Sequence, residues 1–419
     1  MPSSRALISL VTAFALALAA GCTTPQDGTS ASAPSMAPAA PPPPPPAASA
    51  PPAPLPPAPF AETLARAGER LVQEAVATVG SGPRELVIDP LIDASTGQQT
   101  SGTVAMGQQI AALVKAKAPA WNVRPLTRTS LANGPLLFIG TLTAINTQND
   151  ATGVADAFRA CMALIDLRTG KLVAKRADRA TVGSVNAEPT AFFRDSPTWS
   201  RDRTVAAYIK SCQGSTTGDA ADPGYLIRLP AQAVLNEATT AYGEGRMPDA
   251  YRLYREARLV AEPGDLRVLN GVYLTSWRTG KRKEAADAFG EIVEAGLESK
   301  KLPIKLFFNP GTTTLLQNAD LRAQYALWLR EVAAQVGGRE SCLKIVGHTS
   351  RTGSAEANDA LSRRRAVVVQ EALERQNKKL ASRLTVEGAG SREVIVGLGT
   401  DDLRDALDRR VEFRTVDCS

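Results

Sequence analysis

The feature that most limits how this chain folds is a proline-rich stretch over residues 23–59. It holds 15 of the chain's 29 prolines, including the unbroken run Pro41 to Pro46, and Asp27 is its only charged residue. Proline fixes its own φ and has no backbone N–H, so such a segment joins neither a helix nor a sheet. In the extended polyproline II form, at ~3.1 Å per residue, it reaches at most roughly 115 Å. We therefore expect residues 23–60 to be a disordered linker.

A targeting signal precedes this linker. Arg5 is followed by the apolar run ALISLVTAFALALAA, and the motif LAAGC ends at Cys22. A short basic region, an apolar stretch and small residues at a cleavage site are typical of a signal peptide. The motif resembles the lipobox of bacterial lipoproteins, which implies that residues 1–22 end in a lipidated cysteine. In that family, a residue other than Asp after the cysteine, here Thr23, directs the lipoprotein to the outer membrane.

Residues 61–228 are predicted to form an α/β domain. A helical pattern covers residues 62–79, a second has Ile110, Leu113 and Val114 on one face, and alternating or apolar runs indicate strands. The strands are ELVIDPL, WNVRPL, LLFIGTLTAI, FRACMALIDL and LVAKRADRA, the last two forming a hairpin around Arg168 to Lys171. This order, with the phrase DLRTGKLV, resembles the small domain of curli-secretion lipoproteins and of lipoprotein activators of penicillin-binding proteins.

Residues 229–300 contain an internal repeat. The members of the first copy return 35 positions later: Tyr242, Gly245, Ala250 and Tyr254 recur as Trp277, Gly280, Ala285 and Phe289. Small residues where helices touch and aromatic residues between them resemble tetratricopeptide repeats. Two repeats need a stacked neighbour to bury their exposed faces. A helical spacer and a peptide-binding groove both fit this pattern.

Residues 301–419 carry the most specific resemblance. The phrases FNPGTTTL, LKIVGHTSRTG, NDALSRRRAVVV, LTVEGAG and DRRVEF occur in this order, with a helical pattern over residues 320–336. Together they resemble the OmpA-like peptidoglycan-binding domain. The resemblance implies a βαβα domain with a sheet of about four strands, so the whole chain is predicted to be an α/β multidomain protein.

The same resemblance implies a binding pocket for the diaminopimelate of a peptidoglycan stem peptide. The family's arginine, which holds the ligand's carboxylate, falls on Arg365, its asparagine on Asn358 and its leucine on Leu361. Spacings of three and four place these residues on one helical face, and we expect Arg365 to face a ligand cleft. Thr349 and Ser350 follow the strand that ends in GHT and complete the expected site.

Ser350 departs from the family, because the family has an aspartate there for the ligand's ammonium. A charge-assisted hydrogen bond contributes about 1.5–3 kcal/mol and a neutral one about 0.5–1.5 kcal/mol. Binding is therefore expected to weaken roughly tenfold or to change its ligand, unless Glu356 or Asp359 substitutes. Arg363 and Arg364 are expected to be solvated, and His348, the chain's single histidine, to be a structural hydrogen-bond partner.

Cysteines and charge agree with an envelope protein. Besides Cys22, the chain has Cys161, Cys212, Cys342 and Cys418, an even number that indicates two disulfides in an oxidising compartment. Three pairings are possible, and since each candidate domain contains two cysteines we expect Cys161–Cys212 and Cys342–Cys418. With no CxxC motif or Cys/His cluster, no zinc site is expected. Residues 301–419 carry 19 Lys and Arg against 15 Asp and Glu, a mild excess that suits a polyanionic neighbour.

The predicted function is a tether and not an enzyme. The sequence lacks a nucleophile elbow, an HExxH motif and a P-loop, and it lacks the basic, aromatic runs of nucleic-acid binding. No cofactor is expected. The expected partners are peptidoglycan, the outer-membrane lipid through Cys22, and an envelope protein that the chain scaffolds. The alternative is a regulatory lipoprotein that activates a peptidoglycan synthase, or serves a secretion machine, through residues 61–300.

Lipidation should depend on Cys22. Its thiol is the acceptor at the lipobox, so Cys22→Ser is expected to leave the precursor uncut and without acyl chains. Metabolic labelling with a radioactive fatty acid, followed by membrane fractionation, measures both. A labelled Cys22→Ser variant in the outer membrane would contradict the prediction.

Overall fold

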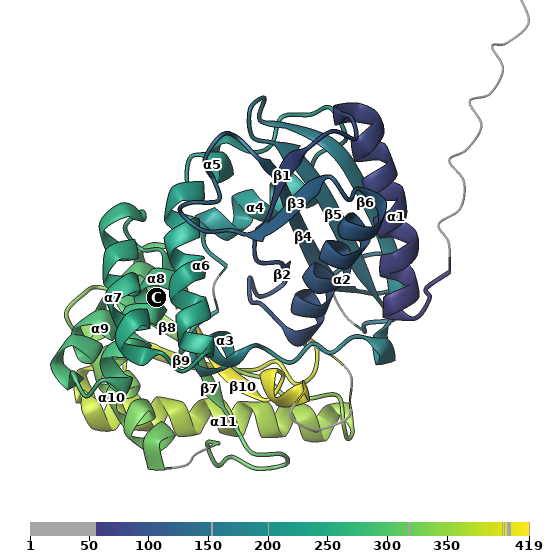
Figure 1. Cartoon of the computed structure of the whole chain (residues 1–419). Helices are drawn as coiled ribbons and strands as arrows, with labels where there is room; N and C mark the ends of the chain where they lie inside the picture. Colours follow the sequence, from purple (N-terminus) through teal and green to yellow (C-terminus); the bar gives the residue numbers. More distant parts are fainter. Residues whose placement is uncertain are drawn as a thin grey trace, which may run out of the picture. The chain divides into compact units, whose positions relative to one another are not determined.

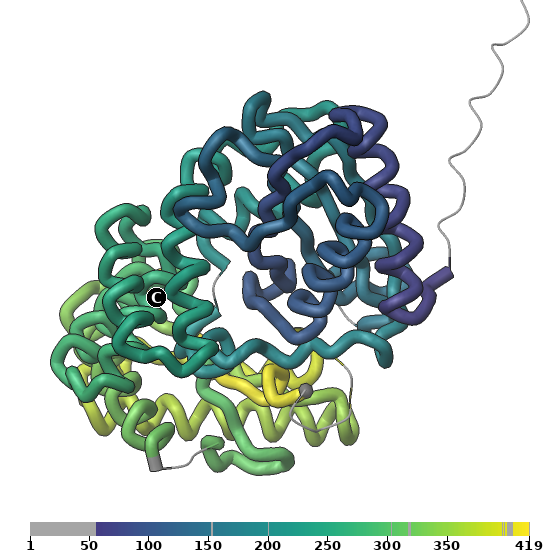
Figure 2. Tube along the Cα trace, viewed as in Figure 1, coloured from purple at the N-terminus to yellow at the C-terminus, as the bar shows by residue number. Residues whose placement is uncertain are grey.

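The computed structural model describes residues 56–419, apart from 152–153, 200, 317–318, 396, 398, 400–403 and 419. The signal peptide with Cys22 and nearly all of the proline-rich linker therefore lie outside the described residues. Two β-sheets and a set of helices make up the described chain (Figures 1 and 2). Within the described residues, no helix is both long enough and apolar enough to cross a membrane.

The first sheet lies in the N-terminal part. Its strands have the order β3-β1-β4-β5-β6, with β2 beside β4, and β1 runs parallel to both β3 and β4. The elements are α1 (Phe60–Val79), β1 (Arg84–Ile88), β2 (Ile92–Asp93), α2 (Ser101–Lys117), β3 (Trp121–Pro125), β4 (Leu136–Ile145), β5 (Ala157–Asp166) and β6 (Lys171–Thr181). The predicted hairpin is confirmed, because β5 and β6 pair antiparallel along their whole length.

Both faces of this sheet are buried. In β4, Leu136 and Phe138 pack into a core under α1 and α2, whereas Leu137 and Ile139 pack into a second core on the opposite face. That second face is covered by α4 (Arg203–Gln213), α5 (Pro223–Leu226) and the start of α6 (Leu229–Gly243). Burial on both faces explains why the first four residues of β4, Leu136 to Ile139, are all apolar and do not alternate.

Helical hairpins follow the first sheet. After η1 (Val182–Ser184) and α3 (Ala191–Asp195), the chain forms two pairs: α6 with α7 (Met247–Val260), and α8 (Leu266–Arg278) with α9 (Arg282–Glu298). The residues that repeat in the sequence have equivalent structural roles in the two helix pairs. Gly245 and Gly280 have φ of 76° and 78° in the two turns, and Ala250, Ala285, Tyr254 and Phe289 are fully buried. A positive φ of this kind favours glycine, which explains its return at position 280.

The second sheet lies in the C-terminal part. Its strands have the order β7-β10-β8-β9, with β10 antiparallel to both of its neighbours and β8 parallel to β9. The elements are β7 (Lys301–Phe307), α10 (Ala319–Gly337), β8 (Cys342–Gly347), α11 (Ala355–Gln376), η2 (Lys378–Leu380), β9 (Leu384–Gly388), η3 (Arg404–Leu407) and β10 (Arg410–Val416). The four strands and two long helices expected for this segment are confirmed.

One apolar core joins the helical hairpins to the second sheet. It runs without a break from Phe192 through α6 to α9 and into β7, α10, β8, α11 and β10. At its centre Phe289 stacks on Trp328, with ring centroids 5.6 Å apart, and the Trp328 indole donates a hydrogen bond of 2.7 Å to the Tyr273 hydroxyl. The stacked neighbour that the second repeat needs is therefore α10.

The two predicted disulfides have different outcomes. The Cys342–Cys418 bond is confirmed and ties the start of β8 to the end of the chain. Cys161 and Cys212 are brought together, but as buried free thiols. Their sulfurs lie 2.7 Å apart, whereas a disulfide is about 2.05 Å long, so the second predicted bond is wrong for this structure.

A buried lysine lies where residues 197–199 run along the edge strand β7. The Lys305 side chain is 2% exposed, its ammonium donates to the Phe193 carbonyl at 2.9 Å, and it lies 4.9 Å from the Trp199 ring centroid. Burial lowers the pKa of Lys305 to about 7, and Asp195 offsets only part of this effect. The folded state therefore disfavours the charged ammonium.

Lys305 should make the chain more stable at high pH. Between pH 7 and the ordinary lysine pKa, the unfolded chain holds a proton that the folded chain gives up, so stability rises with pH in that window. We expect a gain of roughly 2 kcal/mol from pH 7 to pH 9, since one pKa unit corresponds to about 1.4 kcal/mol. Lys305→Met should stabilise the chain at pH 7 and should abolish the increase in stability from pH 7 to pH 9. Urea unfolding at both pH values measures these changes.

The control is Lys344→Met, because the Lys344 side chain is 40% exposed and pairs with Glu387 on the surface. Its pH profile should match that of the wild type. A Lys305→Met chain that keeps the wild-type pH profile would refute the assignment to this lysine.

Candidate ligand-binding site in the C-terminal part

The candidate site lies where β8 ends and α11 begins. The strand ends at Gly347, residues 348–354 form a loop, and the Ser354 hydroxyl caps α11 by accepting from the Ala357 N–H at 3.2 Å. A cap of this kind satisfies one of the free N–H groups in the first helical turn. The loop and the first turns of α11 therefore have defined positions relative to the sheet.

Two glycines let the α11 backbone lie directly on the sheet. Gly347 and Gly388 are register partners at the ends of β8 and β9. A Cβ on Gly347 would lie 1.9 Å from the Ser362 carbonyl oxygen, and one on Gly388 would lie 2.7 Å from the Asp359 carbonyl oxygen. Only glycine fits at either position, so these two residues set the distance between α11 and the sheet.

Arg365 is inside the protein and not open to a cleft. Its side chain is 0% exposed, and its guanidinium donates to three backbone carbonyls: those of Thr312 at 2.9 Å, His348 at 2.9 Å and Asn309 at 3.1 Å. The expectation that Arg365 faces an open ligand cleft is wrong for this structure, because the loop carbonyls occupy its donors. In this state Arg365 links the turn after β7 to the end of β8.

The other predicted site residues gather around the same loop. Thr349 and Ser350 are buried, and the Ser350 hydroxyl lies 3.2 Å from the Thr352 hydroxyl. The Asn358 side-chain amide donates to the Thr352 carbonyl at 3.0 Å, so it stabilises the loop. Leu361 is half-buried. The structure thus brings the five predicted residues to one end of the sheet, and their role in binding stays a prediction.

The two acids considered as substitutes for the missing aspartate differ in position. Asp359 forms an ion pair of 2.5 Å with Arg392, whereas Glu356 is exposed in the first turn of α11. Arg363 and Arg364 are exposed, as expected for solvated side chains. Glu356 is therefore the acid that a cationic ligand reaches without breaking an ion pair to Arg392.

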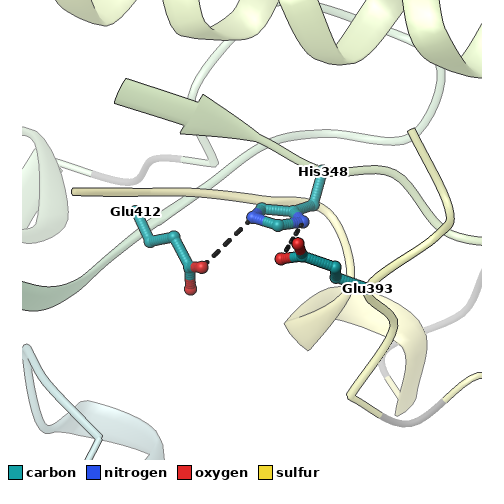
Figure 3. Close-up of side chains that lie close together, drawn as sticks. All are labelled: His348, Glu393 and Glu412. Atoms are coloured by element: carbon teal, nitrogen blue, oxygen red, sulfur yellow. Dashed lines mark ion pairs between the residues drawn. The ribbon is translucent and has the colours of Figure 1, made fainter. Parts of the chain in front are cut away.

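A second cluster lies beside the site, around His348 at the end of β8. The imidazole is 1% exposed and lies between two carboxylates: Nε2 is 3.3 Å from Glu412 Oε1, and Nδ1 is 4.0 Å from Glu393 Oε2 (Figure 3). Burial and the nearby Arg410 lower the pKa of His348, which favours the neutral ring. Burial alone would raise the pKa of Glu412, but His348 and Arg410 hold it well below its usual range.

No sequence pattern predicted this cluster. Glu393 and Glu412 lie 45 and 64 positions after His348, in a loop and in β10, and no motif joins them. Within the described residues, these three side chains could hold a metal ion, because their ligand atoms all lie within 4.8 Å of one another.

Comparison with known proteins identifies the family of the mixed α/β domain that contains this site. Residues 307–406 match the OmpA family, so the C-terminal part of the chain is an OmpA family domain. This confirms the resemblance over that range. The other two resemblances, of residues 61–228 and 229–300, stay predictions. Comparison with curated proteins finds no significant match.

Solved structures with a similar domain include three from bacterial envelopes. The peptidoglycan-associated lipoprotein of Burkholderia pseudomallei is 22% identical, over 27% of this chain and 89% of its own, with a TM-score of 0.24. The periplasmic domain of Helicobacter pylori MotB is 19% identical, over 27% and 71%, with a TM-score of 0.22. The cell wall anchor of the Pseudomonas aeruginosa T6SS is 17% identical, over 31% and 97%, with a TM-score of 0.23. At these scores the family match alone supports the assignment.

The contact between Gly347 and α11 should be sensitive to a single methyl group. Gly347→Ala would force α11 away from β8, because the new Cβ meets backbone and not a movable side chain. Overpacking of this kind costs about 1–3 kcal/mol or more. Thermal unfolding should show the loss. Gly338→Ala is the control, since a Cβ there has its nearest neighbour at 3.5 Å, and a loss equal to that of Gly347→Ala would contradict the argument.

Proposed function

We propose that the chain is an outer-membrane lipoprotein that binds peptidoglycan non-covalently and tethers the outer membrane to the cell wall. The observation that carries the proposal is the OmpA family match over residues 307–406, the range in which Asn358, Leu361 and Arg365 lie. Domains of this family bind peptidoglycan without catalysis. We accordingly propose that this chain is not an enzyme.

The proposed ligand is the diaminopimelate of the stem peptide, which presents a carboxylate beside an ammonium. The carboxylate would replace one or more of the carbonyls that Arg365 now contacts, from Asn309, Thr312 and His348. A charged acceptor forms a hydrogen bond roughly twice as strong as a neutral carbonyl does, and it matches the guanidinium fork. The two loops that carry these carbonyls must then shift when the ligand binds.

The ammonium is proposed to lie near Ser350, where the family has its aspartate. The hydroxyl of Ser350 is an uncharged acceptor, and the side chain is 4% exposed. Binding through it gives up the charge–charge contribution, which makes this wall contact weaker and more easily reversed than that of a domain with the aspartate.

The remaining parts have proposed roles in the tether. Acylated Cys22 would hold the chain in the membrane, and residues 23–60 would span the distance to the wall. Residues 61–228 and 229–300 are proposed to scaffold an envelope protein. Large apolar side chains on their surface suit a protein partner: Ile227, Leu259 and Val260 are 77%, 84% and 60% exposed.

Arg365 provides the sharpest test of wall binding. Arg365→Lys keeps the charge but loses the fork, so we expect at least tenfold weaker binding to purified sacculi. Arg365→Ala should also lower the melting temperature, because it leaves three backbone carbonyls without this donor. Pelleting of the full mature chain with sacculi, beside thermal unfolding, separates the two effects. Arg364→Ala is the matched control, since Arg364 is exposed and the charge change is the same.

A folded Arg365→Lys chain that binds like the wild type would place the ligand elsewhere. Ser350→Asp then locates the ammonium: restoring the family's acid should tighten binding by about 1 kcal/mol or more. Acetylation of the diaminopimelate amine should remove that gain. If Ser350→Asp changes nothing, the ammonium lies nearer Glu356 or Asp359.

A further inference from the structure

His348 is buried with unsatisfied ring nitrogens. Its side chain is 1% exposed, and neither Nδ1 nor Nε2 has a partner with hydrogen-bond geometry. Buried polar atoms nearly always have a partner, so an imidazole without one calls for an explanation. The ring lies between the carboxylates of Glu393 and Glu412 (Figure 3).

We propose that His348, Glu393 and Glu412 bind a divalent transition-metal ion of the zinc class. One imidazole nitrogen and two carboxylates are a ligand set that Zn²⁺ accepts, with its fourth position left to water. Ligand atoms at about 2.0–2.1 Å from a tetrahedral Zn²⁺ lie about 3.3 Å apart. The observed distance from His348 Nε2 to Glu412 Oε1 is 3.3 Å, which already matches one edge of such a site.

Glu393 supplies the adjustable ligand. Its side chain is 45% exposed and its carboxylate lies 4.0 Å from the ring, so it must move closer when the ion binds. Glu412, at 18% exposed, lies on β10, and His348 directly follows the neighbouring strand β8, since Gly347 pairs with Val411. One ligand on the sheet, one directly after a strand and one on a loop allow the site to form with little rearrangement.

Two arginines now balance the charge of the carboxylates. Arg410 Nε lies 3.2 Å from Glu412 Oε2, and its side chain is 4% exposed. Arg414 pairs with both Glu393 and Glu412, but its side chain is 40% exposed. The ion would displace Arg414 into solvent and leave Arg410 in place, so Arg414 is the competitor of the metal.

A cleft borders this cluster at Glu412. Its volume is about 870 Å³, and Glu412 and Ile395 form part of its wall, with Trp199, Asp202, Glu298 and Lys301 on other sides. A metal site needs an entry path as well as its ligands. The inference is independent of whether the domain binds the cell wall.

The experiment titrates the untagged mature chain, freed of metal by a chelator, with ZnCl₂ in a calorimeter. We expect one ion per chain through this site. Glu393→Gln should weaken binding at least about tenfold, and Arg414→Gln should strengthen it roughly two- to fivefold by removing the competitor. Glu387→Gln is the control: it makes the same charge change on a side chain 43% exposed in the same sheet, and should leave affinity unchanged.

A direct readout comes from the ring itself. Because His348 is the chain's single histidine, ¹⁵N-histidine labelling gives one pair of ring nitrogen signals, and Zn²⁺ should shift one of them. Binding that survives Glu393→Gln, as it would at the Cys161 and Cys212 thiols, overturns the proposal. So do unchanged ring signals at millimolar Zn²⁺. Both variants alter half-exposed side chains, so the test does not depend on replacing the buried His348.

Discussion

The structure depends on one apolar core that the helical hairpins and the C-terminal sheet share. Phe289 on α9 stacks on Trp328 of α10, and Tyr273 of α8 accepts the Trp328 N–H, so neither part could bury its aromatic residues alone. At the other end of the hairpins, α6 contributes to two cores. Leu229 and Ala233 pack on the first sheet, whereas Ala238 and Tyr242 belong to the shared core. A short repeat array is stable here because a folded neighbour covers each of its ends.

Close contacts between backbone segments also position the candidate site. Gly347 and Gly388 remove two side chains so that backbone meets backbone, and Arg365 then reaches the loops from the buried side of α11. The Arg365 guanidinium would have two roles. It donates to the loop carbonyls in this structure, and it would donate to a carboxylate in the proposed complex. The energy of each existing hydrogen bond that the ligand replaces is therefore subtracted from the free energy of binding.

Much of the fold could be predicted from the sequence, because periodicity and turn residues are local properties. Apolar runs predicted the strands around Phe138 and Ala163. The 35-residue repeat indicated that Gly245 and Gly280 are equivalent. The Cys342–Cys418 pair followed from the location of two cysteines in one candidate domain. The Cys161–Cys212 bond did not, since proximity brings two sulfurs together without requiring that they be oxidised.

Side-chain surroundings set by distant segments could not be predicted. Arg365 is enclosed by carbonyls from Asn309 and Thr312, more than 50 positions earlier, and helical spacing says nothing about them. His348 meets Glu412 only because β10 returns beside β8, and Glu393 comes from a loop 45 positions later. Lys305 reads as an exposed strand residue until residues 197–199 cover it.

The Cys342–Cys418 bond would have a mechanical consequence in the proposed tether, where the chain is held at both ends. It closes a covalent ring over a sequence separation of 76, and Thr349, Ser350, Asn358, Leu361 and Arg365 all lie inside that ring. In that tether, tension from the membrane side would reach Cys342 and divide there between two arms, one along β8 and one through the bridge into β10. Each arm would then carry only part of the load, so the bond would shield the residues inside the ring from unfolding under tension.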